Sequence, residues 1–186
     1  VVGLSDLQAA RQGRAALPSN PVLITFDDGW RDTLTHAAPE LARRGLPAVL
    51  FLASEAVVLD APRWWQDALV QAWAEPTARG RLWAAAGFSS EAPPSDAAWR
   101  LTAHLAGWSE CERMAWLEQH AIGVVAIIPE RQMLTVEALA QVEPVALELA
   151  GHGHTHAPLT LVADPVAELT ASYRLVKQYH AGVAAM

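Results

Sequence analysis

Residues 22–26 read Val-Leu-Ile-Thr-Phe, and Asp27-Asp28-Gly29 follows them directly. A short, nearly continuous apolar run of this kind is typical of a strand buried on both faces of a parallel sheet. Residues 47–53 read Pro-Ala-Val-Leu-Phe-Leu-Ala and predict a second buried strand. Between the two runs, Pro39 suits the first turn of a helix and Gly45 suits its end. A strand, a helix and a strand joined by short links predict a βαβ unit, and therefore an α/β fold.

A third short strand is predicted at residues 145–149, shortly before Gly151-His152-Gly153-His154-Thr155-His156. In open or barrel-like parallel sheets, the loops after the carboxyl ends of the strands hold the ligand site. Asp27 and Asp28 follow the first strand, and the histidines follow the third. We therefore expect both groups at the same rim of one sheet, although they lie far apart in the sequence.

Each of these two groups also has an ordinary explanation. Two adjacent carboxylates just past an apolar strand are costly to gather unless a cation balances them, but an Asp-Gly pair also suits a helix cap or a turn. His152 and His156 are four positions apart, which places both imidazoles on one face of a helical turn and recurs in zinc sites. A solvated polar loop is the alternative, and in an extended loop His154 would point the same way as both. From the residues alone, the histidines favour a metal site and the aspartates favour the turn.

The pattern turns helical and rich in tryptophan between about residues 61 and 133. Trp65, Leu69 and Trp73 recur at intervals of four, on one face of a helix. We interpret this segment as a helical insertion into a single α/β domain that covers residues 1–186. Its tryptophans could stack on sugar rings, but side chains of this size lie more often in a core.

Capping signals predict where several helices begin. Ser95 can cap a helix over residues 96–105, and Ser109 with Glu112 forms a capping box. Thr135 can cap a short helix, and Asp164-Pro165 combines an N-cap residue with proline at the first helical position. Residues 122–128 fit either a strand or a buried turn, and periodicity does not decide between them.

The composition narrows the class of protein. Of the 186 residues, 52% are hydrophobic and 18% are charged, which is typical of a soluble globular protein. The formal net charge of −7 argues against nucleic acid or an anionic membrane as the main partner. The apolar runs are too short to cross a bilayer, so no membrane span is expected. Cys111 is the only cysteine, which allows no internal disulfide and leaves the cellular compartment unknown.

Two motifs resemble those of a known family. Thr25-Phe26-Asp27-Asp28-Gly29 resembles the first motif of the polysaccharide deacetylases, the NodB-homology family or carbohydrate esterase family 4. Residues 148–159, Glu-Leu-Ala-Gly-His-Gly-His-Thr-His-Ala-Pro-Leu, resemble the second motif, in which one histidine lies four places after another. The resemblance covers about residues 4–60 and 130–182 and leaves out the tryptophan-rich segment. The two motifs occur in the family's order, each after a predicted strand, which makes the resemblance specific.

The resemblance implies a role for each matching residue. Asp27 would be the catalytic base, and Asp28, His152 and His156 would bind the metal. The ion would be zinc by default, with cobalt, nickel or manganese as alternatives. The substrate would be an N-acetylated carbohydrate, and the reaction would remove N-acetyl groups from amino sugars of a polysaccharide or its precursor. Trp30 stands where the family often has an aromatic residue, and it could line the sugar site or pack on the rim.

The chain departs from the family pattern at two points. Gly153 replaces the usual serine or threonine that helps to hold the histidine loop, so His154 could compete as a ligand. The family's later motifs, including a general-acid histidine, would lie beyond Met186. The expected fold is therefore part of an irregular (β/α) barrel that carries the helical insertion, and its uncovered sheet edge would favour self-association. The alternative function is that of an inactive metal- or glycan-binding relative or fragment.

Overall fold

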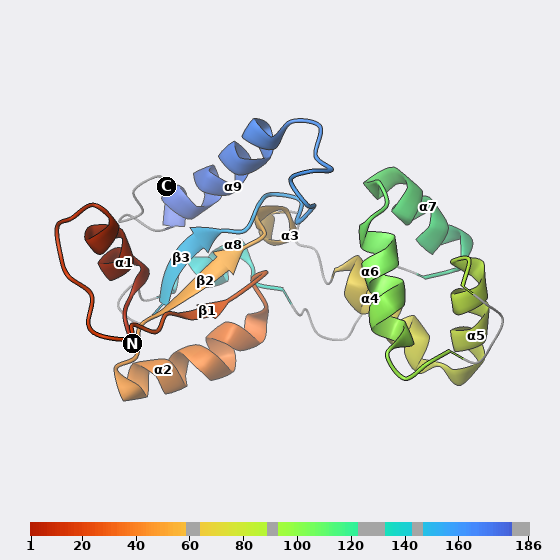
Figure 1. Cartoon of the computed structure of the whole chain (residues 1–186), viewed down its shortest axis with the longest axis horizontal. Helices are drawn as coiled ribbons and strands as arrows, with labels where there is room; N and C mark the ends of the chain where they lie inside the picture. The colour runs from red at the N-terminus through yellow and green to blue at the C-terminus, as the bar shows by residue number, and fades with distance from the viewer. Residues whose placement is uncertain (59–63, 89–92, 123–132, 143–146, 180–186) are drawn as a thin grey trace. The chain divides into compact units, whose positions relative to one another are not determined.

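A computed structural model of the chain describes residues 1–58, 64–88, 93–122, 133–142 and 147–179 (Figure 1). The chain divides into two compact units. The first unit consists of residues 1–62 and 130–186, and the second consists of residues 63–129. Each unit has a hydrophobic core of its own. Whether the two units form a single deacetylase domain with an insertion stays a prediction.

The first unit is built on a small parallel sheet. Its strands are β1 (Ile24–Phe26), β2 (Ala48–Leu52) and β3 (Leu147–Gly151), in the spatial order β1-β2-β3. All pairs are parallel, with Ala48 beside both Ile24 and Leu147. The α/β class and the first two strands are thereby confirmed, but β1 is not buried as predicted, because it lies at an edge of the sheet, where Thr25 is exposed and Ile24 and Phe26 are half-buried. The third predicted strand is present as β3 from Leu147, and its predicted start at residue 145 lies outside the described part of the chain. The described residues show no barrel, so the barrel stays a prediction.

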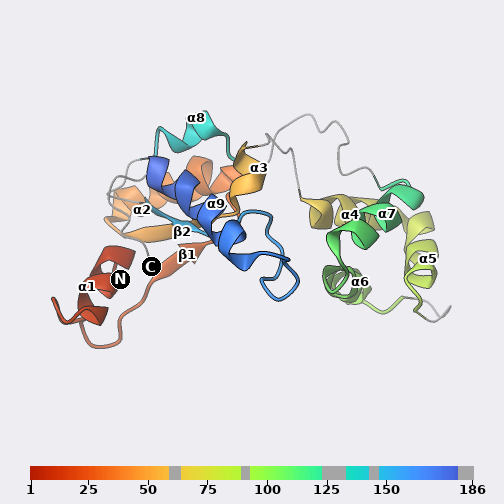
Figure 2. The same cartoon turned by 90° about the horizontal axis from the view of Figure 1, so that it is seen from above.

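Helices cover both faces of this sheet. Leu50 and Leu52 of β2 are fully buried, and they pack in one core cluster with side chains of α2 (Ala38–Arg44), α8 (Val136–Leu139) and α9 (Pro165–Tyr179). Val49, which points to the other face, packs with Leu4 of α1 (Leu4–Arg11) in a second cluster. Figure 2 shows α1 and α8 on opposite sides of the sheet. A strand covered on both faces must be apolar throughout, and this explains the continuous apolar run at residues 47–53, which contains β2.

Local signals set several helix boundaries in the first unit. α2 ends at Gly45, whose φ of +62° is the left-handed conformation of a helix C-cap. The helical stretch begins before Pro39, because a π-helical turn, η1 (Thr33–Ala37), leads into α2. In a regular α-helix the proline ring would clash with the carbonyl of Thr35, and the wider turn avoids this contact. Sequence reasoning had no signal for that turn.

The two caps predicted for the first unit are confirmed. Thr135 Oγ1 accepts a hydrogen bond from the Ala138 amide at 3.1 Å at the start of α8. Asp164 Oδ1 accepts from the amides of Val166 and Ala167 at 3.1 and 3.0 Å at the start of α9. Both side chains satisfy amides that have no partner inside the helix.

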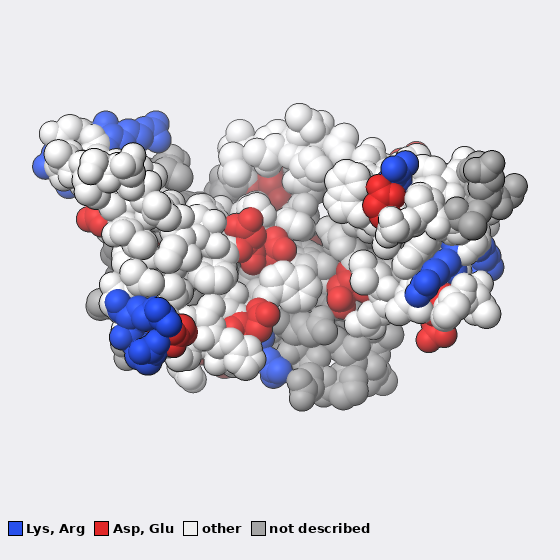
Figure 3. All heavy atoms as spheres, turned by 60° about the horizontal axis from the view of Figure 1, so that its bottom comes forward, with Lys and Arg blue, Asp and Glu red and all other residues white. Residues whose placement is uncertain are grey.

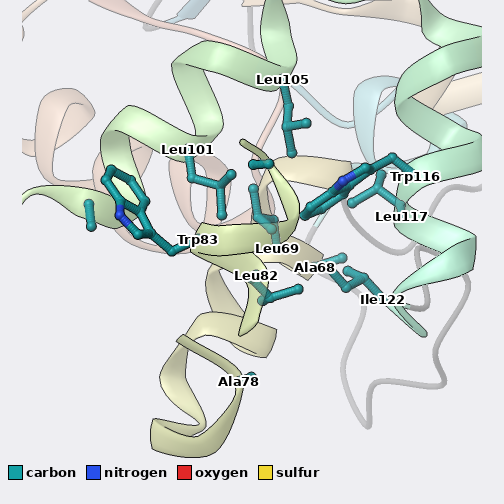
Figure 4. Packing of buried hydrophobic residues seen from close by; sticks show 12 residues of the cluster. Ala68, Leu69, Ala78, Leu82, Trp83, Leu101, Leu105, Trp116, Leu117 and Ile122 are labelled. Atoms are coloured by element: carbon teal, nitrogen blue, oxygen red, sulfur yellow. The ribbon is translucent and has the colours of Figure 1, made fainter. Parts of the chain in front are cut away.

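The second unit is helical. Its helices are α4 (Trp65–Ala74), α5 (Pro76–Ala85), α6 (Ala97–Ala106) and α7 (Glu110–Gln119). Figure 4 shows their side chains meeting in one core, where Leu82, Leu101 and Leu117 are fully buried. Tryptophans of this segment contribute to the same core, as their size suggested: Trp83 and Trp116 are buried, and Trp65, Trp73 and Trp108 pack against them. Trp99 is the exception, since it is 73% exposed.

The capping signals of the second unit have different outcomes. Glu112 N donates to Ser109 Oγ at 3.3 Å while Ser109 N donates to Glu112 Oε2 at 3.1 Å, so the predicted capping box is confirmed. The prediction for Ser95 is wrong by one residue, because Asp96 occupies the N-cap position of α6. The Asp96 carboxylate accepts from Arg100 Nε at 2.9 Å, one helical turn later. Most of the ambiguous segment 122–128 lies outside the described residues.

Among the described helices, none combines the length and the apolar character that a membrane span requires. On the face shown in Figure 3, the described Lys and Arg side chains form small separate groups.

Candidate metal centre

The middle strand ties the two predicted metal-binding loops together. Directly after β2, the Ala53 amide donates to the carbonyl of Asp28 at 3.3 Å, in the loop that follows β1. The carbonyl of Leu52 accepts from the His152 amide at 2.8 Å, in the loop that follows β3. Two consecutive residues therefore hold both loops at one carboxyl-terminal edge of the sheet, where parallel sheets bind ligands.

The turn after β1 presents Asp28 through an uncommon backbone conformation. Asp28 has a φ of +73° and Gly29 has a φ of +99°. A Cβ atom at position 29 would lie 3.0 Å from Leu52 Cδ2, so this position requires glycine both for its φ and for its close approach to β2. The left-handed conformation costs a residue with a side chain about 1–2 kcal/mol. Strain of this kind at Asp28 is typical of functional sites.

The loop after β3 brings His156 back beside His152. Residues 152–157 form no helical turn, so the expected helical explanation of the four-residue spacing is wrong. Gly153 has a φ of +79° and His156 has a φ of +62°, and these left-handed residues reverse the chain. The ring centroids of His152 and His156 lie 5.1 Å apart. A second strained residue thus occurs at a predicted metal ligand.

The three predicted ligands converge on one point. Asp28, His152 and His156 each offer one ligand atom, and these atoms all lie within 4.8 Å of one another. Asp28 Oδ1 lies 3.5 Å from His152 Nε2 and 3.1 Å from His156 Nε2. Ligand atoms around a tetrahedral ion with bonds near 2.0–2.1 Å are about 3.3–3.4 Å apart. The donor set and its spacing therefore fit a divalent cation such as zinc, and they fit equally the other ions that accept nitrogen and oxygen ligands.

The surroundings of Asp28 favour the ionised form of its carboxylate. Its pKa is lowered below the usual value, chiefly because it accepts a hydrogen bond from His156; burial opposes this effect. The positive charge of protonated His156, a hydrogen bond from Trp30 and the charge of His152 lower the pKa further. Trp30 Nε1 donates to Asp28 Oδ2 at 3.2 Å, which leaves Oδ1 directed at the histidines. A negatively charged oxygen aimed at two imidazoles is what a metal-bound carboxylate requires.

The remaining predicted residues lie beside this centre. Asp27 is exposed and does not belong to the group of three ligands, and its carbonyl accepts from the Gly29 amide at 2.9 Å. His154 lies outside that group as well. Its Nδ1 forms a hydrogen bond with Ser54 Oγ at 2.8 Å, so one ring nitrogen is engaged elsewhere. Trp30 is half-buried and contacts the centre through its indole nitrogen.

Sequence reasoning missed two buried residues that contact the histidine loop (residues 152–157). Ser54 is 1% exposed and begins α3 (Ser54–Val58), and Glu168 is 5% exposed in the first turn of α9. Glu168 Oε1 accepts from the amides of His154 and Thr155, both at 2.7 Å. A glutamate near a helix N-terminus is common because the helix dipole favours it, so nothing in the sequence distinguished Glu168 from a surface residue.

Comparisons with known proteins add a structural similarity. No protein-family model matches the chain, and no curated protein matches it in sequence. The chain is similar to a solved structure of the BpsB deacetylase domain from Bordetella bronchiseptica, with 18% sequence identity and a TM-score of 0.48. The match covers 97% of this chain and 59% of that one, so the chain spans well under two thirds of the domain's length.

Proposed function

We propose that the chain carries the metal centre of a hydrolase that removes N-acetyl groups from amino sugars of a polysaccharide or its precursor. The observation that carries this proposal is the convergence of Asp28, His152 and His156, with Asp27 next to the first ligand in the chain. Two imidazoles and one carboxylate form a ligand set used by catalytic zinc sites. Structural zinc sites have four protein ligands instead, and the described residues offer three here.

Solvent access to the ligands supports a catalytic role. The side chains of His152, His156 and Asp28 are 38%, 25% and 22% exposed. A site that is closed by protein on all sides could not admit a sugar, whereas this one opens at the edge of the sheet. With this exposure, water and an acetamide group could reach an ion that Asp28, His152 and His156 would hold.

The proposed chemistry is hydrolysis of an amide bond. A bound ion would polarise the acetamide carbonyl and lower the pKa of a bound water molecule. Asp27 would act as the general base and take a proton from the attacking water. The water oxygen would bond to the acetyl carbon, the carbon–nitrogen bond would break, and acetate and a protonated amine would leave. Asp28, His152 and His156 would hold the ion in place.

The substrate class comes from the two sequence motifs. Residues 25–29 and 148–159 resemble the corresponding motifs of polysaccharide deacetylases, and Trp30 directly follows the first motif. We propose that the Trp30 ring forms part of the wall of the sugar site. Its indole nitrogen is engaged by Asp28, so the ring is held at the centre. Aromatic rings provide an apolar surface with one polar end, which suits a site that is partly wet.

A second candidate function is metal or glycan binding without turnover. Asp27 is exposed and is not one of the three converging ligands, so its reach toward a water molecule at the centre decides between the two functions. A base that cannot reach the attacking water would leave a binding site without catalysis.

Metal titration combined with an acetate assay separates these functions. The purified chain should bind zinc, and the Asp28→Asn variant should bind it far more weakly. The zinc-loaded chain should release acetate from an N-acetylglucosamine oligomer, and Asp27→Asn should abolish that release while it preserves zinc binding. Zinc binding without acetate release would favour the second function. Equal zinc affinities of the wild type and Asp28→Asn would refute both functions.

A further inference from the structure

We infer that Glu168 is a positioning residue for the metal centre: its buried carboxylate fixes the backbone between His152 and His156. This inference rests on the proposed metal site, and it concerns a residue of α9 that is not one of the three ligands. The evidence lies in the hydrogen bonds of the loop, in two close approaches to glycine, and in the burial of the carboxylate.

The histidine loop is held from two sides. On one side, the amides of Ser54 and Glu55 donate to the carbonyls of Gly153 and His154 at 3.2 and 2.9 Å. On the other side, Glu168 Oε1 accepts from the amides of His154 and Thr155, both at 2.7 Å. The carbonyls of Gly153 and His154 are thus bound by α3, and the amides of His154 and Thr155 are bound by α9. A loop held on both sides cannot shift without breaking several hydrogen bonds at once.

Glu168 also reaches the residue next to His156. Thr155 Oγ1 donates to Glu168 Oε1 at 3.1 Å, and it accepts from the Ala157 amide at 3.3 Å. The hydroxyl therefore links the carboxylate to the backbone on the far side of His156. This link supports the turn at which His156 adopts its left-handed φ of +62°. Hydrogen bonds to a charged acceptor are about twice as strong as neutral ones.

Two glycines allow α9 to come this close. A Cβ atom at Gly151 would lie 2.6 Å from Ser172 Oγ, and a Cβ atom at Gly153 would lie 3.0 Å from Glu168 Oε1. Glu168 and Ser172 are one helical turn apart on the same buried face of α9. A larger residue at 151 would therefore force the Ser172 side chain or α9 itself to shift. Gly153, where the family resemblance predicts serine or threonine, therefore suits a loop that an outside carboxylate holds.

The burial of Glu168 excludes an ordinary surface role. The residue is 5% exposed, and no Lys or Arg forms an ion pair with it among the described residues. A buried carboxylate is costly unless hydrogen-bond donors surround it, and the Glu168 carboxylate accepts hydrogen bonds from His154 and Thr155. An apolar residue at this position would leave the amides of His154 and Thr155 without this acceptor. The carboxylate therefore has a specific task, which is to order the loop that carries two metal ligands.

The chain offers a matched control for this inference. Glu148 on β3 accepts from the Leu4 amide at 2.7 Å and from the Ser5 amide at 3.2 Å, so it is also a carboxylate that binds consecutive backbone amides. Its partners belong to α1 and not to the histidine loop. Glu168→Gln and Glu148→Gln remove the same charge from the same kind of contact, but only the first change affects the metal loop.

The test measures the zinc affinity of the wild type, Glu168→Gln and Glu148→Gln by competition with a chelating dye. Loss of a group that orients metal ligands lowers affinity by about 10–100-fold, which is the result expected for Glu168→Gln. Glu148→Gln should stay within about twofold of the wild type. Hydrogen exchange of the metal-free protein should show faster exchange of the His154 and Thr155 amides in Glu168→Gln alone.

The outcomes distinguish this inference from the proposed function. A wild type that binds no zinc refutes the metal site itself, whereas the exchange data still report whether Glu168 orders the loop. If the wild type binds zinc and Glu168→Gln binds it equally well, the inference is overturned and the metal site stands. An equal loss in both variants would show a general effect of stability and would also overturn it. Should Glu168→Gln not fold, Thr155→Val removes only the hydroxyl link, and an unchanged zinc affinity would count against the inference.

Discussion

The backbone at His156 provides a quantitative test of the site's geometry. His156 has a φ of +62°, a conformation that costs a residue with a Cβ atom about 1–2 kcal/mol but costs glycine nothing. We compare His156→Ala with His156→Gly in metal-free protein. Both variants lose the imidazole, so they share the loss of its contact with Asp28, and they differ only in the Cβ atom.

The sign of the difference depends on the conformation at position 156. At a position with ordinary negative φ, alanine would be more stable than glycine by about 0.4–1 kcal/mol, because the unfolded glycine chain has more freedom to lose. At a left-handed position, the strain of about 1–2 kcal/mol outweighs this term. We therefore expect His156→Gly to exceed His156→Ala in unfolding free energy by up to about 1.6 kcal/mol.

Gly45 calibrates the comparison. It has the same φ of +62°, and a Cβ atom there would meet nothing within 4 Å. Gly45→Ala therefore measures the backbone strain alone and should cost a similar amount. Native-state hydrogen exchange of the buried Val49 and Leu50 amides reports the stability of the first unit, and a change of 1 kcal/mol alters the rate by about fivefold. If His156→Ala proved more stable than His156→Gly while Gly45→Ala lost stability, the left-handed turn at His156 would be refuted.

Three further predictions concern acidity, the second unit and the sheet edge. Zinc affinity should fall as the pH drops, because metal ligands must be deprotonated, whereas Asp28, with its lowered pKa, stays ionised to lower pH than an ordinary aspartate; a zinc affinity that does not depend on pH would contradict the ligand assignment. In the metal-free protein, the lowered pKa of Asp28 stabilises the fold above the unfolded-state value of about 3.9, and this contribution is lost as the pH falls through the folded-state value. Leu101→Ala, at a fully buried position of the second unit, should cost that unit about 2–5 kcal/mol in urea unfolding followed by tryptophan fluorescence. The zinc affinity of Leu101→Ala should equal that of the wild type. A loss of zinc affinity together with the loss of stability would show that the metal centre does not depend on the first unit alone. Light scattering should show self-association that rises with concentration, and a stable monomer would count against an uncovered sheet edge.

Local chemistry in the sequence was sufficient to predict the positions of the strands and most of the helix caps. Residues 47–53 are apolar without interruption because β2 is covered on both faces, whereas the run at 22–26 contains the exposed Thr25 and belongs to β1, which pairs with β2 at the edge of the described sheet. Thr135, Ser109 and Asp164 act as caps because each has an oxygen that can reach amides two or three residues later. Ser95 shows the limit of such reasoning, since the neighbouring Asp96 takes the cap position and pairs with Arg100 instead.

The details of the metal centre could not be predicted without the three-dimensional structure. The spacing of His152 and His156 suggested a shared ion, but the reason is a turn with left-handed residues and not the helical turn that a spacing of four indicates. No sequence rule predicts a left-handed histidine, because the conformation is imposed by contacts from elsewhere in the chain. Glu168 supplies such contacts from α9, and its sequence surroundings are those of an ordinary first helical turn.

The strain at the ligands bears on why these residues are present at all. Asp28 and His156 both have positive φ, so together they cost about 2–4 kcal/mol that glycine would avoid. A domain has only about 5–15 kcal/mol of stability, so this cost is large for loop side chains that have no function. A bound ion at one hundred times its dissociation constant would return about 2.7 kcal/mol, which is similar to the strain. The metal-free centre is therefore expected to be the less stable form of the fold, and zinc should stabilise the wild type by more than it stabilises any variant that replaces a strained ligand with glycine.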